Sequence, residues 1–443
     1  MTRRFTFHRI MATTVLATTT ILILMAGEVA TCAKSSYWLK NDGTLWAFGR
    51  NQEYQLGDRS NTERTQPVQT LEQGTKMANC HKIVTGEDCA FVIKTDGTLW
   101  VFGNGIKGQL GIGTVEQKYA TDIQMGYRQK VKLLVTSNLH TLAVTEENEL
   151  YTWGNNDYGQ LGDEQGAKIL SQPRQRLSDV PIRSAAVGSN HSLALSTDNR
   201  LYAFGRNNNG QLCDGTTTDA PQPKLVMTDV VSIAAGGDYS AVIKTDGSLW
   251  VNQNAGWQMA RIMDSNAKRA LIADGRIYII TKNNELWIGN VTGFPTKVLD
   301  NVERIAARGT LAFAIQYDGT LYDCSGTPKQ VMTNVAKVAT SGEHTLALKH
   351  DGYLYAWGKN EQGQLGVGSH REQTSPIMVG QDYTPESMGI DETTGQLPSG
   401  PVRIYNLQGQ RVATTSRQFV ADDLQQLPVG VYVAGGKKWI VRK

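Results

Sequence analysis

One hydrophobic pattern recurs from near the start of the chain to about residue 380. An apolar segment, a short polar turn and a second apolar segment appear most clearly in Lys40–Gly49 (KNDGTLWAFG) and Lys94–Gly103 (KTDGTLWVFG). β-branched and aromatic residues dominate both flanks, which is typical of buried strands. We therefore predict a β-hairpin in each copy, with Asp-Gly, Asn-Asn or Asp-Asn supplying the positive φ of a two-residue primed turn.

Eight such turns occur, and their second residues are 54, 51, 51, 48, 37, 35 and 33 residues apart. Another strand pair precedes each turn, as in Val231–Lys244, and a proline often opens a short strand after it. About four strands per unit is the size of one propeller blade. The predicted fold is all-β: a seven- or eight-bladed β-propeller, eight by repeat count, over residues 28–382.

The two ends of this array predict how the ring closes. The repeat array begins with the second half of a unit, Val29–Lys40. It ends near Gln381 with the first half of a unit, Tyr353–Val379. Joined, these halves would form one shared blade that holds the ring shut without a covalent bond. A closed ring also leaves only short sheet edges exposed.

The loop after the hairpin carries a second motif, seen in Gly108-Gln-Leu-Gly111, Gly159-Gln-Leu-Gly162 and Gly363-Gln-Leu-Gly366. Together with Asp/Asn-Gly-x-Leu-Trp/Tyr-x-Phe/Trp-Gly, it resembles the regulator of chromosome condensation repeat over residues 29–381. The resemblance implies a propeller, usually of seven blades, that acts on a protein through one face. Its relatives include nucleotide-exchange factors and a secreted bacterial enzyme inhibitor. Three units between Gly247 and Gly352 lack the loop motif, so this sector is degenerate.

The N-terminus predicts export. Arg3, Arg4 and Arg9 precede an apolar and Thr-rich run from Ile10 to Ala26, typical of a signal peptide. We expect residues 1–27 to be a cleaved signal peptide, with an uncleaved anchor as the alternative. The protein would then be secreted or held at the cell surface, with no membrane span after signal removal.

The C-terminal region differs from the repeats. Residues 383–401 are rich in Gly, Pro, Ser and Thr and are expected to be a linker. Residues 402–443 alternate apolar and polar positions between glycine turns, which predicts a small all-β module. Its Ile404–Gly409 and Leu427–Tyr432 segments resemble the C-terminal sorting domain of type IX secretion. The alternative is a β-module that packs on the propeller.

Composition narrows the partner class. Charged residues are scarce at 19% and glycine is abundant at 45 residues, which favours turns and strands. The net charge of +3 depends on the three N-terminal arginines, since 44 − 3 leaves 41 basic against 41 acidic residues. This balance excludes an electrostatic argument for nucleic acid or an anionic membrane as partner.

The five cysteines form no C-x-x-C motif, so they give no metal or redox signature. Two arrangements stay open for them. One disulfide could join two of Cys32, Cys80 and Cys89 in an oxidising compartment. Separate buried thiols that act as small hydrophobes are the other arrangement, which we favour.

No catalytic constellation emerges. Gly103–Gly108 fits G-x-G-x-x-G, but no helix is expected after it to bind a phosphate. His140, His191 and His344 recur once per blade, so the ring separates them, and we expect each to bond its adjacent turn and fix a strand. The same argument assigns turn formation to Asp42, Asp96, Asp246, Asp318 and Asp351. We predict no catalytic residue, no metal, no cofactor and no enzymatic activity.

Binding residues are expected where repetition breaks. The predicted loops 117–128 and 252–257 depart from the repeat and contain Tyr119, Tyr127, Arg128 and Trp257, residue types enriched at binding hot spots. The alternative is that these side chains pack against neighbouring blades. The sequence thus predicts an exported, non-enzymatic, monomeric propeller that binds an unknown protein through loops on one face. A surface glycan-binding module and a secreted enzyme inhibitor are alternatives, and a guanine-nucleotide exchange factor is the least favoured.

Overall fold

The computed structural model describes residues 27–116, 118–123, 129–137, 139–163, 166–253 and 256–380, and four strand segments at 401–406, 411–418, 430–434 and 437–441. The predicted signal peptide up to residue 26 and most of the predicted linker lie outside these residues. So do the predicted site residues Tyr127 and Arg128.

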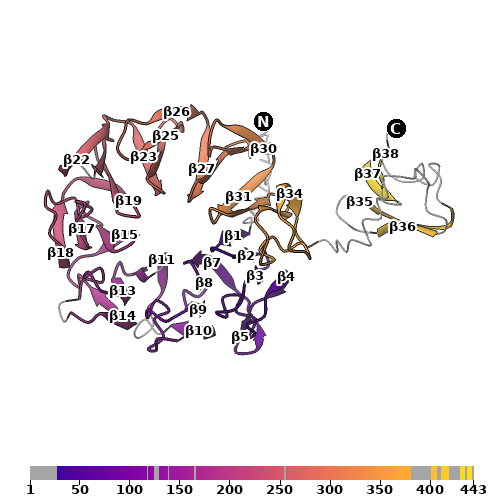
Figure 1. Ribbon diagram of the computed structural model, residues 1–443, viewed down its shortest axis with the longest axis horizontal. Coiled ribbons are helices and arrows are strands. Elements are labelled where there is room, and N and C mark those ends of the chain that lie inside the picture. The colour runs from indigo at the N-terminus through magenta and orange to yellow at the C-terminus, as the bar shows by residue number, and fades with distance from the viewer. Residues whose placement is uncertain are drawn as a thin grey trace, which may run out of the picture.

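Eight four-stranded antiparallel sheets stand around a central channel, as Figure 1 shows, and the described residues contain no helix. This confirms the all-β propeller and the count of eight blades. The strands of blades 1–4 are β1 (Glu28–Thr31), β2 (Ser35–Leu39), β3 (Leu45–Gly49) and β4 (Arg64–Gln69); β7 (Cys80–Thr85), β8 (Cys89–Lys94), β9 (Leu99–Gly103) and β10 (Lys118–Ile123); β11 (Val131–Thr136), β12 (His140–Thr145), β13 (Leu150–Asn155) and β14 (Ile169–Arg176); β15 (Ile182–Val187), β16 (His191–Ser196), β17 (Leu201–Gly205) and β18 (Ala220–Met227).

Blades 5–8 follow the same order. Their strands are β19 (Val230–Gly236), β20 (Tyr239–Lys244), β21 (Leu249–Gln253) and β22 (Gly256–Met263); β23 (Ala267–Ala273), β24 (Arg276–Thr281), β25 (Leu286–Asn290) and β26 (Thr296–Leu299); β27 (Val302–Arg308), β28 (Leu311–Gln316), β29 (Leu321–Asp323) and β30 (Lys329–Met332); β31 (Val335–Thr340), β32 (His344–Lys349), β33 (Leu354–Gly358) and β34 (Gln373–Met378). A small hairpin of β5 (Leu71–Glu72) and β6 (Thr75–Lys76) follows blade 1.

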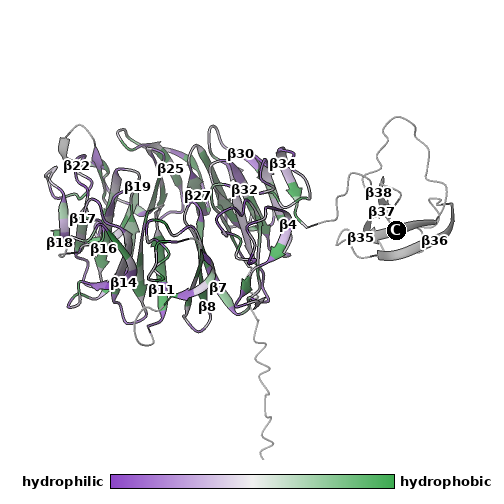
Figure 2. Ribbon diagram, turned by 60° about the horizontal axis from the view of Figure 1, so that its bottom comes forward, coloured by the Kyte–Doolittle hydropathy of each residue, from purple (hydrophilic) through white to green (hydrophobic). Residues whose placement is uncertain are grey.

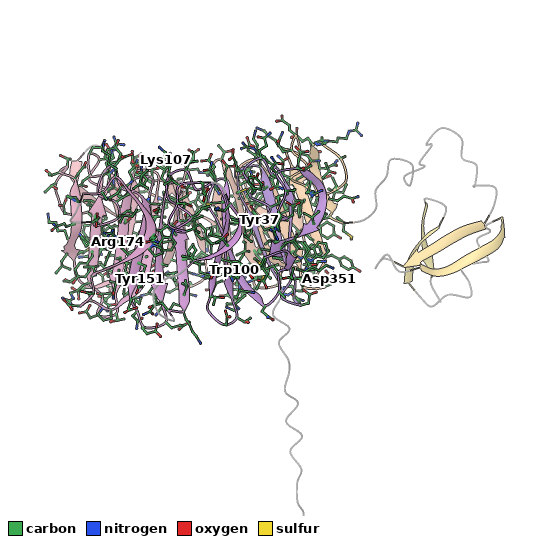
Figure 3. The ribbon with its side chains drawn as sticks, turned by 90° about the horizontal axis from the view of Figure 1, so that it is seen from below. Tyr37, Trp100, Lys107, Tyr151, Arg174 and Asp351 are labelled. Carbon is green, nitrogen blue, oxygen red and sulfur yellow. The ribbon has the colours of Figure 1, made fainter. Side chains whose placement is uncertain are left out.

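The ring has two faces. The first strand of each blade lines the channel and the fourth lies outermost (Figure 1). We call the face that carries the turns after the first strands and the loops after the third strands the loop face. The opposite face, with the hairpin turns between second and third strands, is the turn face. Figure 3 places Lys107, in a loop after a third strand, near the upper edge, and Asp351, in a hairpin turn, near the lower edge.

The predicted shared blade is wrong, because every blade is one continuous stretch of chain. The recurring hairpin turn lies in the middle of a blade, so Val29–Lys40 forms the first two strands of blade 1. Residues 353–379 likewise supply the last two strands of blade 8. The ring closes by packing the two complete sheets against each other. That apolar interface includes Val29, Phe48, Leu346, Leu348, Leu354 and Leu365.

The hairpin turns are longer than the predicted two residues. The Lys40 N–H donates to the Thr44 carbonyl at 2.9 Å, and Gly43 N–H donates to the Lys40 carbonyl at 3.0 Å. Asp42 Oδ1 accepts bonds from the N–H and hydroxyl of Thr44, which lowers the pKa of Asp42. These bonds hold a three-residue connection in which Gly43 alone needs positive φ, here 78°.

The other turn acids bond the residue two positions on in the same way, which confirms their predicted role. The pairs are Asp96 with Thr98, Asp246 with Ser248, Asp318 with Thr320 and Asp351 with Tyr353.

The core lies between blades, where the apolar faces of neighbouring sheets meet. Figure 2 shows apolar residues along the strands in the wall of the ring. Trp153 of blade 3 is fully buried, lies 6.3 Å from the ring of Phe91 in blade 2, and donates to the Gln109 carbonyl at 2.8 Å. A Cβ at Gly111 would lie 2.8 Å from Trp153 Nε1, and Gly111 has φ of 74°. The loop motif therefore needs glycine here so that it can cover the next blade.

All five cysteines are buried free thiols, as favoured above. Burial raises the pKa of the Cys80, Cys89, Cys213 and Cys324 thiols to about 12. None of the described residues belongs to a helix that could cross a membrane.

The C-terminal strands β35 (Pro401–Asn406), β36 (Arg411–Gln418), β37 (Gly430–Ala434) and β38 (Lys437–Val441) form one sheet in the order β36-β35-β37-β38. The predicted all-β character of this module is therefore confirmed.

Candidate functional site

The recurring histidines join neighbouring blades. Each begins the second strand of its blade, opposite a glycine of the third strand. Each Nε2 atom lies within hydrogen-bond distance of a serine hydroxyl in the next blade. The pairs are His140 with Ser192 at 3.0 Å, His191 with Ser240 at 2.8 Å and His344 with Ser36 at 2.7 Å.

His344 belongs to a relay of four groups, with Ser341, Ser36 and the Gln364 carbonyl as the other three. Ser341 Oγ lies 2.9 Å from His344 Nδ1, and Ser36 donates to the Gln364 carbonyl at 2.7 Å. One neutral tautomer satisfies every group: Ser341 donates to Nδ1, the Nε2–H donates to Ser36, and Ser36 donates to Gln364. This relay crosses the junction between the last and the first blade. We call it the closing relay.

The relay of His140 repeats this arrangement with Ser137, Ser192 and the Gln160 carbonyl. The predicted bond to the adjacent turn is thus confirmed for His140 and His344. The bond to the next blade was missed, although the sequence holds a signal for it. The histidines occupy the first residue of the second strand in blades 3, 4 and 8. The next residue along the chain is a serine only in the blades that follow these three, namely Ser192, Ser240 and Ser36.

His191 differs from the other two histidines because Gly188 replaces the turn serine. A Cβ at Gly188 would lie 2.0 Å from His191 Cε1, so the ring occupies the space of a side chain there. His191 Nδ1 has no hydrogen-bond partner among the described residues. Burial lowers the pKa to about 3 for His140 and His344 and to about 4 for His191. All three are therefore neutral near pH 7 and act as structural links.

The predicted site residues do not come together. Tyr119 lies on β10 in blade 2 and Trp257 on β22 in blade 5. The predicted loops are also shorter than expected. Lys118–Ile123 forms a strand, and Gln253 pairs with Gly256 so that only two residues connect β21 and β22.

An exposed apolar patch occupies the loop face of blades 2 and 3. Ile106 and Val115 of the blade 2 loop are 53% and 52% exposed, and Tyr158 and Ile169 of blade 3 are 39% and 38% exposed. The two blades touch here, because Gly113 N–H donates to the Ser171 carbonyl at 2.7 Å. We call these four side chains the loop-face patch. Its residues lie inside or beside the repeated motif, so no break in the repeat marks them in the sequence.

A basic group borders the loop-face patch. The Arg206 guanidinium carbon lies 4.9 Å from the centre of the Tyr158 ring, a cation–π distance. Tyrosine and arginine, which Tyr158 and Arg206 supply here, are residue types enriched at protein-binding hot spots.

The channel opens on the loop face through a cavity of about 400 Å³. Backbone of the turns after the first strands forms much of its wall, including Gly86, Gly188, Gly237 and Gly309. Asp274 and Arg308 are its charged residues. Within the described residues, no three His, Cys, Asp or Glu side chains gather closely enough to hold a metal ion.

Comparison with known families agrees with the repeat pattern. A profile described as an RCC1-like domain matches residues 22–242, and profiles of the regulator of chromosome condensation (RCC1) repeat match residues 335–364 and 351–414. The chain thus carries an RCC1-like domain and RCC1 repeats, as the motifs predicted.

Curated relatives match parts of the chain. The ultraviolet-B receptor UVR8 of Arabidopsis thaliana is 26% identical over 63% of this chain and 64% of its own length. The guanine nucleotide exchange factor SRM1 of Saccharomyces cerevisiae is 32% identical over 42% of this chain and 39% of its own length. The E3 ubiquitin-protein ligase HERC2 of Mus musculus is 27% identical over 47% of this chain and 4% of its own length. The chain spans less than two thirds of each of these relatives.

Solved structures share the fold. Human WBSCR16 has a TM-score of 0.54 at 17% identity, over 76% of this chain and 94% of that one. Prp20p of Saccharomyces cerevisiae has a TM-score of 0.54 at 17% identity, over 79% of this chain and 88% of that one. At this level of identity, the likeness shows the propeller fold alone.

Proposed function

We propose that this chain, which carries an RCC1-like domain and RCC1 repeats, is an exported, non-enzymatic propeller that binds a partner protein through the loop-face patch. The observation that carries the proposal is the exposure of Ile106 and Val115, each above half, on the loop face that also carries Tyr158 and Arg206. Single exposed apolar residues are ordinary on a protein surface, but several on one face of two adjoining blades favour an interaction site.

The rigidity of the scaffold supports this role. The turns and loop motifs are fixed by hydrogen bonds, so the patch is ordered before any partner arrives and binding costs little conformational entropy. Curated relatives with the same repeats include a receptor, a ligase and an exchange factor, so the repeat occurs with several activities. Because the chain offers an exposed apolar surface, the proposed role is binding without catalysis.

The test is direct binding. The purified chain would be used to capture partners from extracts, and each partner would then be made recombinantly and titrated against the chain. We expect Ile106→Ser and Tyr158→Ala to weaken binding at least about tenfold, because each removes a contact of hot-spot size. Phe294→Ser is the matched control, since Phe294 is 82% exposed on a loop of blade 6.

Three outcomes would contradict the proposal. Equal weakening by Phe294→Ser would show that the contact is not local to the patch. Binding to glycan arrays without any protein partner would replace it with the glycan-binding alternative. Acceleration of nucleotide release from a GTPase by the purified chain would replace it with the exchange-factor alternative.

Export is a separate part of the proposal. The basic and apolar segment of residues 1–27 and the β-module of residues 402–443 are the supporting features. Fusing residues 1–27 to a periplasmic reporter should direct it across the membrane. Deleting residues 402–443 should stop delivery to the cell surface, and unchanged surface delivery would reject the sorting role.

A further inference from the structure

The turn-face end of the channel concentrates positive charge that the fold does not require. In four blades, the residue that follows the β-bulge of the first strand is a cation: Lys82, Arg269, Arg304 and Lys337, which pair with Ile93, Ile280, Ile315 and Leu348. Blades 3, 4 and 5 build the same position with Leu133, Ser184 and Ser232. A leucine or serine therefore suffices for the strand, and the cations need another explanation.

Three of these cations line one cavity. Arg269, Arg304 and Lys337 surround a space of about 340 Å³ between the first strands of blades 6, 7, 8 and 1, with Glu28 as the acid in its wall. Two of the contributing blades, 6 and 7, belong to the degenerate sector identified from the sequence. The cavity is thus built where the repeat departs from its pattern.

Tyr278 also lines this cavity, although its hydroxyl oxygen is buried and not exposed to the open space. It is fully buried, and its hydroxyl has no hydrogen-bond partner among the described residues. The equivalent Tyr37 of blade 1 donates to the Gln55 carbonyl at 2.6 Å, within the loop motif of its own blade. Blade 6 lacks that loop motif, so Tyr278 has lost this acceptor.

The acids nearby are already engaged. Glu28 Oε2 accepts the Ile83 N–H of blade 2 at 3.0 Å, and Glu303 Oε1 accepts from Arg304 Nε at 2.9 Å. Arg269 donates to the Glu303 carbonyl at 2.9 Å. In the cavity wall itself, three cations therefore stand against the single carboxylate of Glu28. Burial lowers the pKa of Lys337, and the positive charges of Arg304 and Lys82 lower it further, against the pull of Glu28 and Glu303.

We propose that this cavity binds a small, multiply charged oxyanion, such as a phosphate or sulfate ester. Two guanidinium groups offer planar pairs of donors that match tetrahedral oxyanions, while Lys337 adds a point charge. A volume of about 340 Å³ is in the range of small-molecule sites. The site opens on the face opposite the loop-face patch, so it stands independently of the proposed protein partner.

Calorimetric titration of the purified full chain at low salt tests the site. The probes are inorganic pyrophosphate, a sulfated disaccharide that distinguishes sulfate esters from phosphate groups, and citrate as a carboxylate of similar charge. We expect Arg304→Gln and Lys337→Gln to weaken pyrophosphate binding about tenfold or more, because each removes a charge-assisted hydrogen bond. Glu28→Gln should tighten it, since the amide keeps an acceptor for Ile83 and removes the opposing charge.

Lys107→Gln is the matched control, because it removes an exposed cation from the loop face. Arg304→Lys should retain part of the affinity. Because Arg304 is exposed, its variants should fold even if Lys337→Gln does not. Three results would overturn the proposal. They are equal weakening by Lys107→Gln, no heat from pyrophosphate or the sulfated disaccharide, and tighter binding of citrate than of both of these probes.

Discussion

Ser36→Ala is the sharpest test of how this ring stays closed. In the closing relay, Ser36 Oγ lies 2.7 Å from His344 Nε2 and donates to the Gln364 carbonyl at 2.7 Å. Ser36 and His344 are fully buried. Alanine would leave a buried imidazole N–H and a buried carbonyl without these partners. Each orphaned group costs roughly 1–3 kcal/mol, so we expect the free energy of unfolding to fall by about 2–6 kcal/mol.

Urea unfolding followed by tryptophan fluorescence measures this loss as a lower midpoint at an unchanged slope. Ser192→Ala removes the same serine from the relay of His140 and should cost a similar amount. Ser265→Ala is the control, because Ser265 is exposed and should change stability by less than about 0.5 kcal/mol.

A double variant separates the relay from ordinary packing. Blade 7 carries Leu311 at the histidine position, so His344→Leu is compatible with the strand. Ser36→Ala combined with His344→Leu should cost less than the sum of the two single changes, by about 0.5–3 kcal/mol, because no buried imidazole is left unpaired. The relay would be refuted if the costs simply add, or if Ser36→Ala is as mild as Ser265→Ala.

The remaining predictions concern burial. Folding holds the pKa of His140, His191 and His344 below the ordinary 6.5, at about 3, 4 and 3. The unfolded chain therefore binds more protons than the folded chain as the pH falls below 6.5. The free energy of unfolding should drop by roughly 2 kcal/mol per histidine at pH 5. Urea titration at several pH values measures this drop, and a flat profile would contradict it. Gly188→Ala should destabilise by about 1–3 kcal/mol in the same assay, since the new Cβ would meet His191 at 2.0 Å, and a neutral result would show that the ring moves freely. Iodoacetamide should label Cys89 only after denaturation, because burial raises its thiol pKa to about 12. Mass spectrometry measures the labelling, and rapid labelling of the native chain would disprove this burial.

Much of the fold follows from local patterns. The spacing of the hairpin turns gave the number of blades, and the acid in each turn predicted its own hydrogen bonds, because both depend on residues two to four positions apart. The same locality explains the errors. The sequence could not show that Asp42 leaves only Gly43 at positive φ, nor that the repeated turn lies in the middle of a blade.

The candidate sites were less predictable than the fold. Tyr119 and Trp257 stand out in the sequence as breaks in repetition, yet they lie three blades apart. Ile106, Val115, Tyr158 and Ile169 look like ordinary members of the repeat. Only the contact between blades 2 and 3 brings the loop of Ile106 and Val115 to the strand that carries Ile169.

The sequence by itself determined an all-β ring of eight hairpin-based units, because hydrophobic alternation and turn chemistry are properties of neighbouring residues. Tertiary structure alone decided which groups meet across the ring. Ser36 reaches a histidine 308 residues away, and Lys82, Arg269, Arg304 and Lys337 share one end of the channel only because the ring is closed. Closure brings the two ends of the array together, and no local pattern specifies which side chains then face each other.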